Sequence, residues 1–286
     1  MTTAFILVLL SAFFHAGWNA FLKASNDKVT YVFYLRIATA VFITLYTAVF
    51  HMQDFYFHKP TIIYALLSSF FFFFYQHFAA VSYKYADVSM VYPITTSSPL
   101  FIVLWAYIFL DEKVTVLGIT GVILILAGCY IMNATRGQGN KKGLYGILLA
   151  FLAAFLYSFG AVSDKLGVDI VNSNLYIMLM ADFILMYSII FTVITHRKAV
   201  SFHKMVKKPI QWNYVILGGI AMAASTVTYR LGLVDMQVSY AAALRQLSAL
   251  FGVLMGIFFL KESYGLKRII GSIVIISGII LIGMGI

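Results

Sequence analysis

The chain has few charged residues, one cysteine and four prolines. Charged residues make up 10% of its 286 positions, whereas a soluble domain carries about 25%. Hydrophobic residues make up 62%. Because so few polar side chains cannot cover the surface of a soluble domain, the composition excludes one and predicts a chain that lives in a lipid bilayer.

The chain also lacks the motifs of common enzyme and metal sites. Its single cysteine, Cys129, excludes an internal disulfide and a metal site built from cysteines. The sequence contains no nucleotide-binding glycine loop, nucleophile elbow or metal-spaced cluster of His, Cys and Glu. We therefore expect no catalytic residues, no metal and no cofactor, and we do not expect an enzyme.

The net charge of +10 is spread over short connections between apolar runs. In these connections the charge sets membrane topology and contacts lipid headgroups. The sequence contains no basic helix or stripe that could bind along a phosphate backbone, so nucleic acid is not an expected partner. Most lysines and arginines fall on the connections after odd-numbered spans, which would place both termini outside the cytoplasm. The less basic side holds Lys59, Lys113, Lys165 and Arg230.

Ten apolar segments of membrane-spanning length fill the chain. Because lipid offers the backbone no hydrogen bonds, such segments must be helices. The first segment has no basic leader before it and is expected to be a retained helix. The spans are expected near 4–22, 30–50, 61–83, 88–110, 115–133, 143–163, 173–195, 211–231, 237–260 and 265–285.

The second half of the chain repeats the first at an offset of 150 residues. Val88, Ser89, Gly121 and Gly128 return as Val238, Ser239, Gly271 and Gly278. Five spans per half is an odd number, so the second copy is inverted in the membrane, as in many secondary transporters. The sequence predicts an all-α integral membrane protein with ten transmembrane helices, built from repeats at 1–135 and 141–286, with a substrate site between them.

The first span ends in a polar stripe. His15, Trp18, Asn19 and Lys23 have the spacing of one helix face. A lipid-facing surface does not carry four such residues, so this face is predicted to point into the bundle. The stripe either holds helices together or lines a substrate path, and both interpretations remain open.

The fourth span concentrates prolines and hydroxyl side chains. Within eleven residues it contains Ser89, Tyr92, Pro93, Thr95, Thr96, Ser97, Ser98 and Pro99. Prolines leave backbone carbonyls free, and irregular backbone at membrane depth is tolerated where it lines a cavity or is buried in protein. We expect a cavity-lining segment, with a purely structural kink as the alternative.

Three ionisable residues are predicted to lie deep in the membrane. Arg245 takes the position of Thr95 in the ninth span, Arg36 lies in the second span, and Asp182 lies in the seventh. A buried charge must be paired or hydrated. Either Asp182 forms an ion pair with one of the arginines, or it carries protons while Arg245 anchors an anion. His15 and His77 are candidate proton relays or plain hydrogen-bonding residues.

The balance of these groups bears on the substrate. Two arginines against one aspartate favour an anionic or zwitterionic solute. Aromatic residues would suit an apolar or cationic portion of it, and the candidates are Trp18, Tyr75, Tyr92 and Tyr157. Glu112 and Glu262, each at the end of a span, are expected to cap the helix that follows them.

At these residues the chain resembles the drug/metabolite transporter superfamily, specifically its ten-helix EamA-like members. The resemblance rests on Trp18-Asn19 with Lys23, on Arg36, on Tyr92-Pro93, and on the span ends Leu110-Asp111-Glu112 and Leu260-Lys261-Glu262. It implies a basket in which helices 1–4 and 6–9 surround a central cavity, with cytoplasmic termini, against the charge count. The cavity residues it implies are Trp18, Asn19, Tyr92, Thr96, Tyr157, Arg245 and Gln246.

The favoured function is secondary transport of a small polar metabolite by alternating access. The solute would be amino-acid-like or an organic anion, and the expected direction is export. The driving force would be a proton gradient or exchange of solutes. The alternatives are a flippase of a lipid-linked intermediate and a membrane-embedded protein that processes headgroups. The expected partners are a small-molecule substrate, the lipid bilayer and protons. We expect a multi-pass protein of the plasma membrane, specifically the bacterial inner membrane. We expect it to be a monomer or a homodimer.

Overall fold

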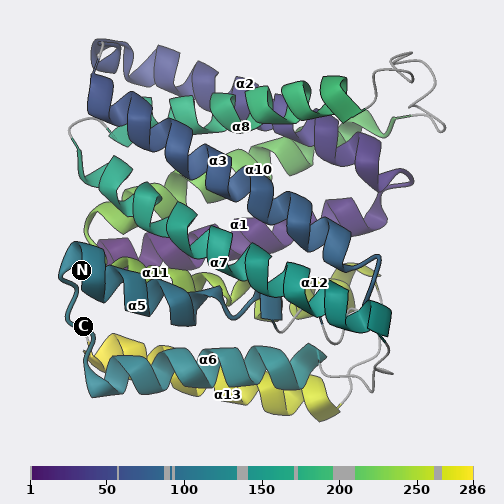
Figure 1. Ribbon diagram of the computed structural model, residues 1–286, viewed down its shortest axis with the longest axis vertical. Coiled ribbons are helices and arrows are strands. Elements are labelled where there is room, and N and C mark those ends of the chain that lie inside the picture. The colour runs from purple at the N-terminus through teal and green to yellow at the C-terminus, as the bar shows by residue number, and fades with distance from the viewer. Residues whose placement is uncertain are drawn as a thin grey trace.

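A computed structural model describes residues 2–56, 58–86, 91, 94–133, 141–170, 173–195, 210–260 and 266–285. Regular structure in these ranges is helical (Figure 1). The helices are α1 (Thr2–Ala24), α2 (Lys28–Phe50), α3 (Lys59–Ser82), α5 (Ser98–Leu110), α6 (Val116–Asn133), α7 (Lys141–Asp169), α8 (Ser173–Thr195), α10 (Trp212–Val234), α11 (Val238–Arg245), α12 (Ser248–Leu260) and α13 (Leu266–Gly285), with the 3₁₀ turn η1 (Met52–Asp54) after α2.

The outer surfaces of these helices suit lipid and not water. Among the described residues, six helices are long and apolar enough to cross a bilayer, namely α1, α2, α3, α7, α8 and α10, and shorter apolar helices accompany them. Large apolar side chains such as Val49 and Tyr107 are 69% and 67% exposed. In water such surfaces would drive association, whereas in a bilayer they face hydrocarbon. The chain is a multi-pass membrane protein.

The repeat is visible in the contacts between α6 and α13, which lie side by side in Figure 1. A Cβ atom on Gly121 would lie 2.6 Å from the carbonyl oxygen of Gly278, and a Cβ on Gly278 would lie 2.6 Å from that of Gly121. Gly128 approaches the backbone of Gly271 in the same way. The 150-residue offset turns the first contact into the second, so a two-fold relation between the repeats passes through this helix pair.

The same relation governs the other helix pairs. α1 packs along α10, the eighth span, and α3 packs along α7, the sixth span. These two pairs exchange when the repeats are exchanged. Because each main contact joins one repeat to the other, the repeats share one core and do not form separate domains.

The fourth and ninth spans are both interrupted, at equivalent positions. The fourth has a turn at Thr96 and Ser97 before α5 begins, and the ninth breaks between α11 and α12 at Gln246 and Leu247. Tight turns close both breaks, with Ser97 N–H donating to Ile94 O at 3.1 Å and Leu247 N–H to Leu244 O at 3.0 Å. The irregular backbone expected in the fourth span is found. The ninth span breaks without a proline.

Glu112 caps a helix, but not the one expected. Its carboxylate accepts the backbone N–H groups of Val238 at 2.7 Å and Ser239 at 3.2 Å, and the Ser239 hydroxyl at 2.6 Å. These are the first residues of α11, in the other repeat, so the expected cap of the following helix α6 is wrong. The reason is tertiary: the end of α5 and the start of α11 meet at one membrane face. Glu262 lies outside the described residues.

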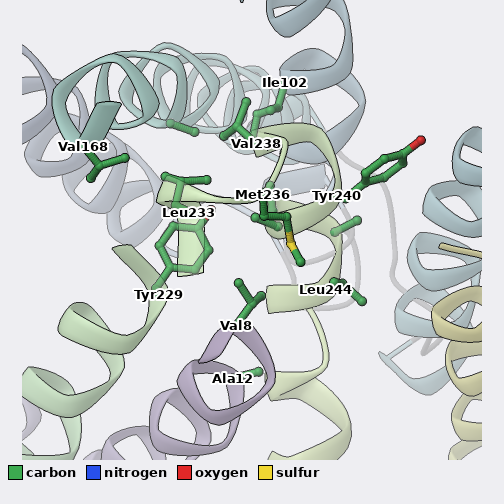
Figure 2. Close-up of a cluster of buried hydrophobic side chains, with 14 of the residues drawn as sticks. Val8, Ala12, Ile102, Val168, Tyr229, Leu233, Met236, Val238, Tyr240 and Leu244 are labelled. Carbon is green, nitrogen blue, oxygen red and sulfur yellow. The ribbon is translucent and has the colours of Figure 1, made fainter. Parts of the chain in front are cut away.

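The buried core is concentrated towards the face at which α1 begins, called the N face; both chain termini lie at this edge in Figure 1. Its largest cluster includes Val8 of α1, Val168 of α7, Leu233 of α10 and most of α11. Figure 2 shows Val8 close to Tyr229, Leu233 and Met236. Towards the opposite face, called the far face, a second cluster is built on three buried residues. The helices are therefore closely packed at the N face, and this end of the bundle is closed.

Substitution of Gly121 tests the two-fold helix contact. In G121A the new Cβ would meet backbone of α13, so the helices must separate, and we expect a loss of about 1–3 kcal/mol in stability, as for overpacked cores. The measurement is the thermal unfolding midpoint of the purified protein in detergent. The control is G252A, because a Cβ there meets nothing within 4 Å. Equal midpoints for the two variants would contradict the packing argument.

A second prediction concerns the cap on α11. In E112A, the N–H groups of Val238 and Ser239 lose their acceptor in a buried site, which costs about 1–3 kcal/mol. We expect a lower thermal midpoint and faster hydrogen exchange at the start of α11. Asp111, its exposed neighbour, has a left-handed backbone (φ 53°) that asparagine also adopts, so D111N is the matched control and should behave as the unsubstituted protein does.

Candidate substrate site at the broken ninth helix

Arg245 is the last residue of α11 and stands at the break in the ninth span. Its guanidinium lies 4.3 Å above the centre of the Tyr229 ring, and its Nη2 lies 3.4 Å from Nδ1 of His15. Among the described residues, no carboxylate comes within ion-pair distance of it. A cation at this depth, held by a ring and an imidazole, is suited to meet an anionic ligand.

The contacts of His15 fix its protonation state. Trp18 donates its indole N–H to Nδ1 of His15 at 3.3 Å, and the Arg245 guanidinium, which can only donate, approaches the same atom. Nδ1 must therefore be the acceptor, so the ring is neutral with its hydrogen on Nε2. A proton on Nδ1 would face two donors, and the ring could keep it only if Arg245 or Trp18 moved.

Aromatic side chains from several helices accompany Arg245. The rings of Tyr75 on α3 and Tyr157 on α7 meet edge to face with centroids 4.9 Å apart, and Phe72 lies 5.4 Å from Tyr157. Trp18 packs edge to face on His15. Tyr75, Tyr157, Trp18 and Arg245 are all only half-buried. This arrangement offers apolar ring faces beside one positive group.

The helix breaks add to the positive potential. α5 and α12 both begin inside the membrane, at the equivalent residues Ser98 and Ser248. The N-terminus of a helix carries about half a positive charge from its free N–H groups. Half-helices of this kind direct their N-termini at anionic substrate groups in other transporters. The turns at the breaks use part of these groups, since Leu100 N–H donates to Ser97 O and Ala249 N–H donates to Gln246 O. The two helix starts therefore add only in part to the positive potential of Arg245.

The other predicted cavity residues have structural partners. Asn19 donates to the carbonyl of His15 at 2.8 Å. Gln246 is the C-cap of α11, and its carbonyl accepts the Ala249 N–H at 2.9 Å and the thiol of Cys129 at 3.9 Å. Thr96 lies half-buried in the turn before α5. Tyr92 falls outside the described residues.

Arg36 is occupied by a separate set of side chains. Its Nη1 donates to the hydroxyl of Ser188 on α8 at 2.7 Å, its Nη2 donates to the side-chain oxygen of Gln76 on α3, and it lies 5.8 Å from the ring centre of Phe73. These partners satisfy the guanidinium without a carboxylate. Arg36 joins α2, α3 and α8, and its partners Ser188, Gln76 and Phe73 are separate from the partners of Arg245.

Asp182 does not form the ion pair that the sequence left open. Its oxygens lie 3.3 and 3.5 Å from the hydroxyl of Thr44, and neither Arg36 nor Arg245 comes within ion-pair distance. The carboxyl group is half-buried between α2 and α8. His77 packs its ring on Phe191 with centroids 4.6 Å apart.

The most buried charges were missed by the sequence interpretation. Arg230, counted above among the connecting cations, is 4% exposed inside α10, and its Nε donates to Asp164 Oδ1 at 2.9 Å. Asp164 on α7 is 0% exposed and was not singled out. The correction follows from helix length, because α10 continues to Val234. The sequence does show Asp164 and Arg230 inside two apolar segments, which could have marked them as buried charges. It does not show that the two side chains meet.

Comparisons with known proteins agree with this architecture. The sequence profile of the EamA-like transporter family matches residues 2–134 and 144–284. An uncharacterized transporter from Archaeoglobus fulgidus is 22% identical over 286 residues, 97% of each chain. One from Clostridium kluyveri is 24% identical over 210 residues, 71% of this chain and 65% of the relative. A solved crystal structure covering 99% of this chain and 97% of its own has a TM-score of 0.80 at 15% identity, which shows the fold alone.

Proposed function

The chain belongs to the EamA-like transporter family, and on that premise we propose that it moves a small anionic or amino-acid-like metabolite across the plasma membrane by alternating access. The observation that carries this proposal is Arg245, a half-buried cation at a helix break with no carboxylate partner among the described residues. Export is the proposed direction, in line with the family resemblance. The bacterial inner membrane is the proposed location.

The surroundings of Arg245 narrow the substrate class. A carboxylate would displace the guanidinium from the face of Tyr229 and replace a cation–π contact by a charged hydrogen bond, which is the stronger interaction. The ring faces of Tyr75, Tyr157 and Trp18 would then take an apolar portion of the same molecule. We propose a monocarboxylate that carries an apolar or aromatic group, with or without an amino group.

Substitution of Arg245 tests the anchor. A panel of carboxylates is first screened for thermal stabilisation of the purified protein, and transport of each hit is measured by counterflow in proteoliposomes. We expect R245Q to remain folded and to lose at least about tenfold in affinity for the hit, because a charged hydrogen bond contributes about 1.5–3 kcal/mol.

The matched control for this test is R36Q. It also removes an arginine from within the membrane, but one whose partners are Gln76 and Ser188. We expect it to retain ligand-induced stabilisation. Unchanged counterflow in R245Q, or equal loss in both variants, would reject Arg245 as the anchor.

We propose Asp182 as the group that couples transport to protons. Its half-buried carboxyl accepts a hydrogen bond from the Thr44 hydroxyl, and neither Arg36 nor Arg245 lies within ion-pair distance of it. A proton can therefore be gained or lost without breaking an ion pair. His15, in contrast, is held as a neutral acceptor by two donors.

In D182N we expect proton-driven accumulation to be lost while exchange of substrate across the membrane continues. Accumulation is measured in proteoliposomes with an imposed pH gradient, and exchange is measured with equal substrate on both sides. T44V is the control, since it removes the hydrogen bond and leaves the titrating group in place. Intact pH-gradient accumulation in D182N would eliminate the residue as the proton carrier.

A further inference from the structure

A buried charge network lies between Arg245 and the N face. Asp164 Oδ1 accepts the Arg230 Nε–H at 2.9 Å and the Tyr176 hydroxyl at 2.6 Å, and the Tyr176 oxygen lies 2.8 Å from the hydroxyl of Ser68. All four residues are at most 4% exposed. They come from α7, α10, α8 and α3, so this single cluster joins four helices from both repeats.

The network stands where the bundle is closed. Asp164 lies five residues before the end of α7, Arg230 four before the end of α10, and Tyr176 three after the start of α8. These three helix ends lie at the N face, together with the buried cluster of Figure 2. On the other side of Arg245, residues such as Trp18, Tyr75 and Tyr157 are half-buried. The charges therefore belong to the closed half.

The network is held at one oxygen only. Both donors converge on Oδ1 of Asp164, while Oδ2 is buried and has no hydrogen-bond partner among the described residues. In the Glu112 cap, by comparison, both carboxylate oxygens accept hydrogen bonds. A buried carboxylate oxygen without a donor is costly, so this closed arrangement is less stable than a fully satisfied one. An interaction that must break in every transport cycle benefits from that imbalance.

The network also touches the substrate site through the backbone. Tyr229, whose ring lies under the Arg245 guanidinium, directly precedes Arg230 in α10. A ligand that drew Arg245 away from Tyr229 would remove a contact from the turn of α10 that also carries Arg230, the partner of Asp164. Movement at the site and movement at the network are thus linked by one rigid element.

We propose that the Asp164–Arg230 ion pair, braced by Tyr176 and Ser68, is the gate that closes the N face of the transporter, and that α10 connects it to Arg245. This inference rests on the proposed alternating access. When the gate opens, α7 and α10 separate at the ion pair, and water enters the buried half of the bundle. The proposal gives Asp164 and Arg230 a role in the transport cycle that differs from binding the substrate.

Thiol labelling tests the gate without any substrate. The native thiol is removed by C129A, and A161C places a reporter on α7 one turn before Asp164, where the side chain is buried. With the ion pair intact, we expect slow reaction with a membrane-impermeant maleimide on purified protein. With D164N added, we expect the labelling rate to rise at least about tenfold, because loss of the ion pair raises the population of the open state.

Two controls separate opening from damage. D169N removes a carboxylate from the same helix, but one that pairs with Lys165 at the surface, and it should leave labelling slow. A second reporter, A40C in the buried part of α2, should stay unreactive in D164N. If D164N does not fold, Y176F, which removes one donor to Oδ1, takes its place and should speed labelling at position 161 to a smaller extent.

The outcomes are distinct. Fast labelling at position 161 alone, in D164N or Y176F and not in D169N, supports the gate. Unchanged labelling at position 161, or faster labelling at both reporters, overturns it and leaves the network as a structural staple. Because the readout needs no ligand, a failed gate is distinguishable from a failed anion site at Arg245.

Discussion

Lipid gives the backbone no hydrogen-bonding partner, and the arrangement of this protein follows from that constraint. Where the ninth span breaks, local turns reuse the backbone groups: the Leu247 N–H donates to Leu244 O at 3.0 Å, and the Ala249 N–H donates to Gln246 O at 2.9 Å. Contacts between the repeats add to these turns, because the Cys129 thiol also donates to Gln246 O and the Glu112 carboxylate accepts the first N–H groups of α11. The backbone groups at these helix ends are therefore satisfied partly by local turns and partly by the packing of one repeat on the other.

The two repeats provide a symmetric frame for a proposed site that is not symmetric. Gly121 against Gly278 and Gly128 against Gly271 repeat the same close approach of backbones. The breaks in the fourth and ninth spans also coincide under the 150-residue offset. At the equivalent position beside those breaks, however, one repeat has the buried Thr95 and the other has the half-buried Arg245. Under the proposed function, a single cation on one side of a two-fold frame would give the ligand one orientation.

The same helix serves the site and the closed face. α10 carries Tyr229 beneath Arg245 and Arg230 against Asp164, so two charge contacts of different kinds depend on one turn of helix. α1 packs along the length of α10, with Ser11 and Ser225 exchanging side-chain-to-backbone hydrogen bonds. In the proposed transport cycle, α10 would carry movement between Arg245 and the N face.

The sequence by itself determined the helical class and the spans, because a continuous apolar run in lipid is stable only as a helix. It also determined the family, because the repeat at an offset of 150 residues can be read directly from the sequence. The sequence also predicted that Arg245 lies too deep in its span to reach the lipid headgroups. Only the tertiary structure decided which charges meet. Asp182 bonds Thr44 and not an arginine, Arg230 is buried against Asp164, and Glu112 caps α11 rather than α6. Partners far apart in the chain are chosen by how helices cross, and helix crossing depends on packing that no single segment encodes.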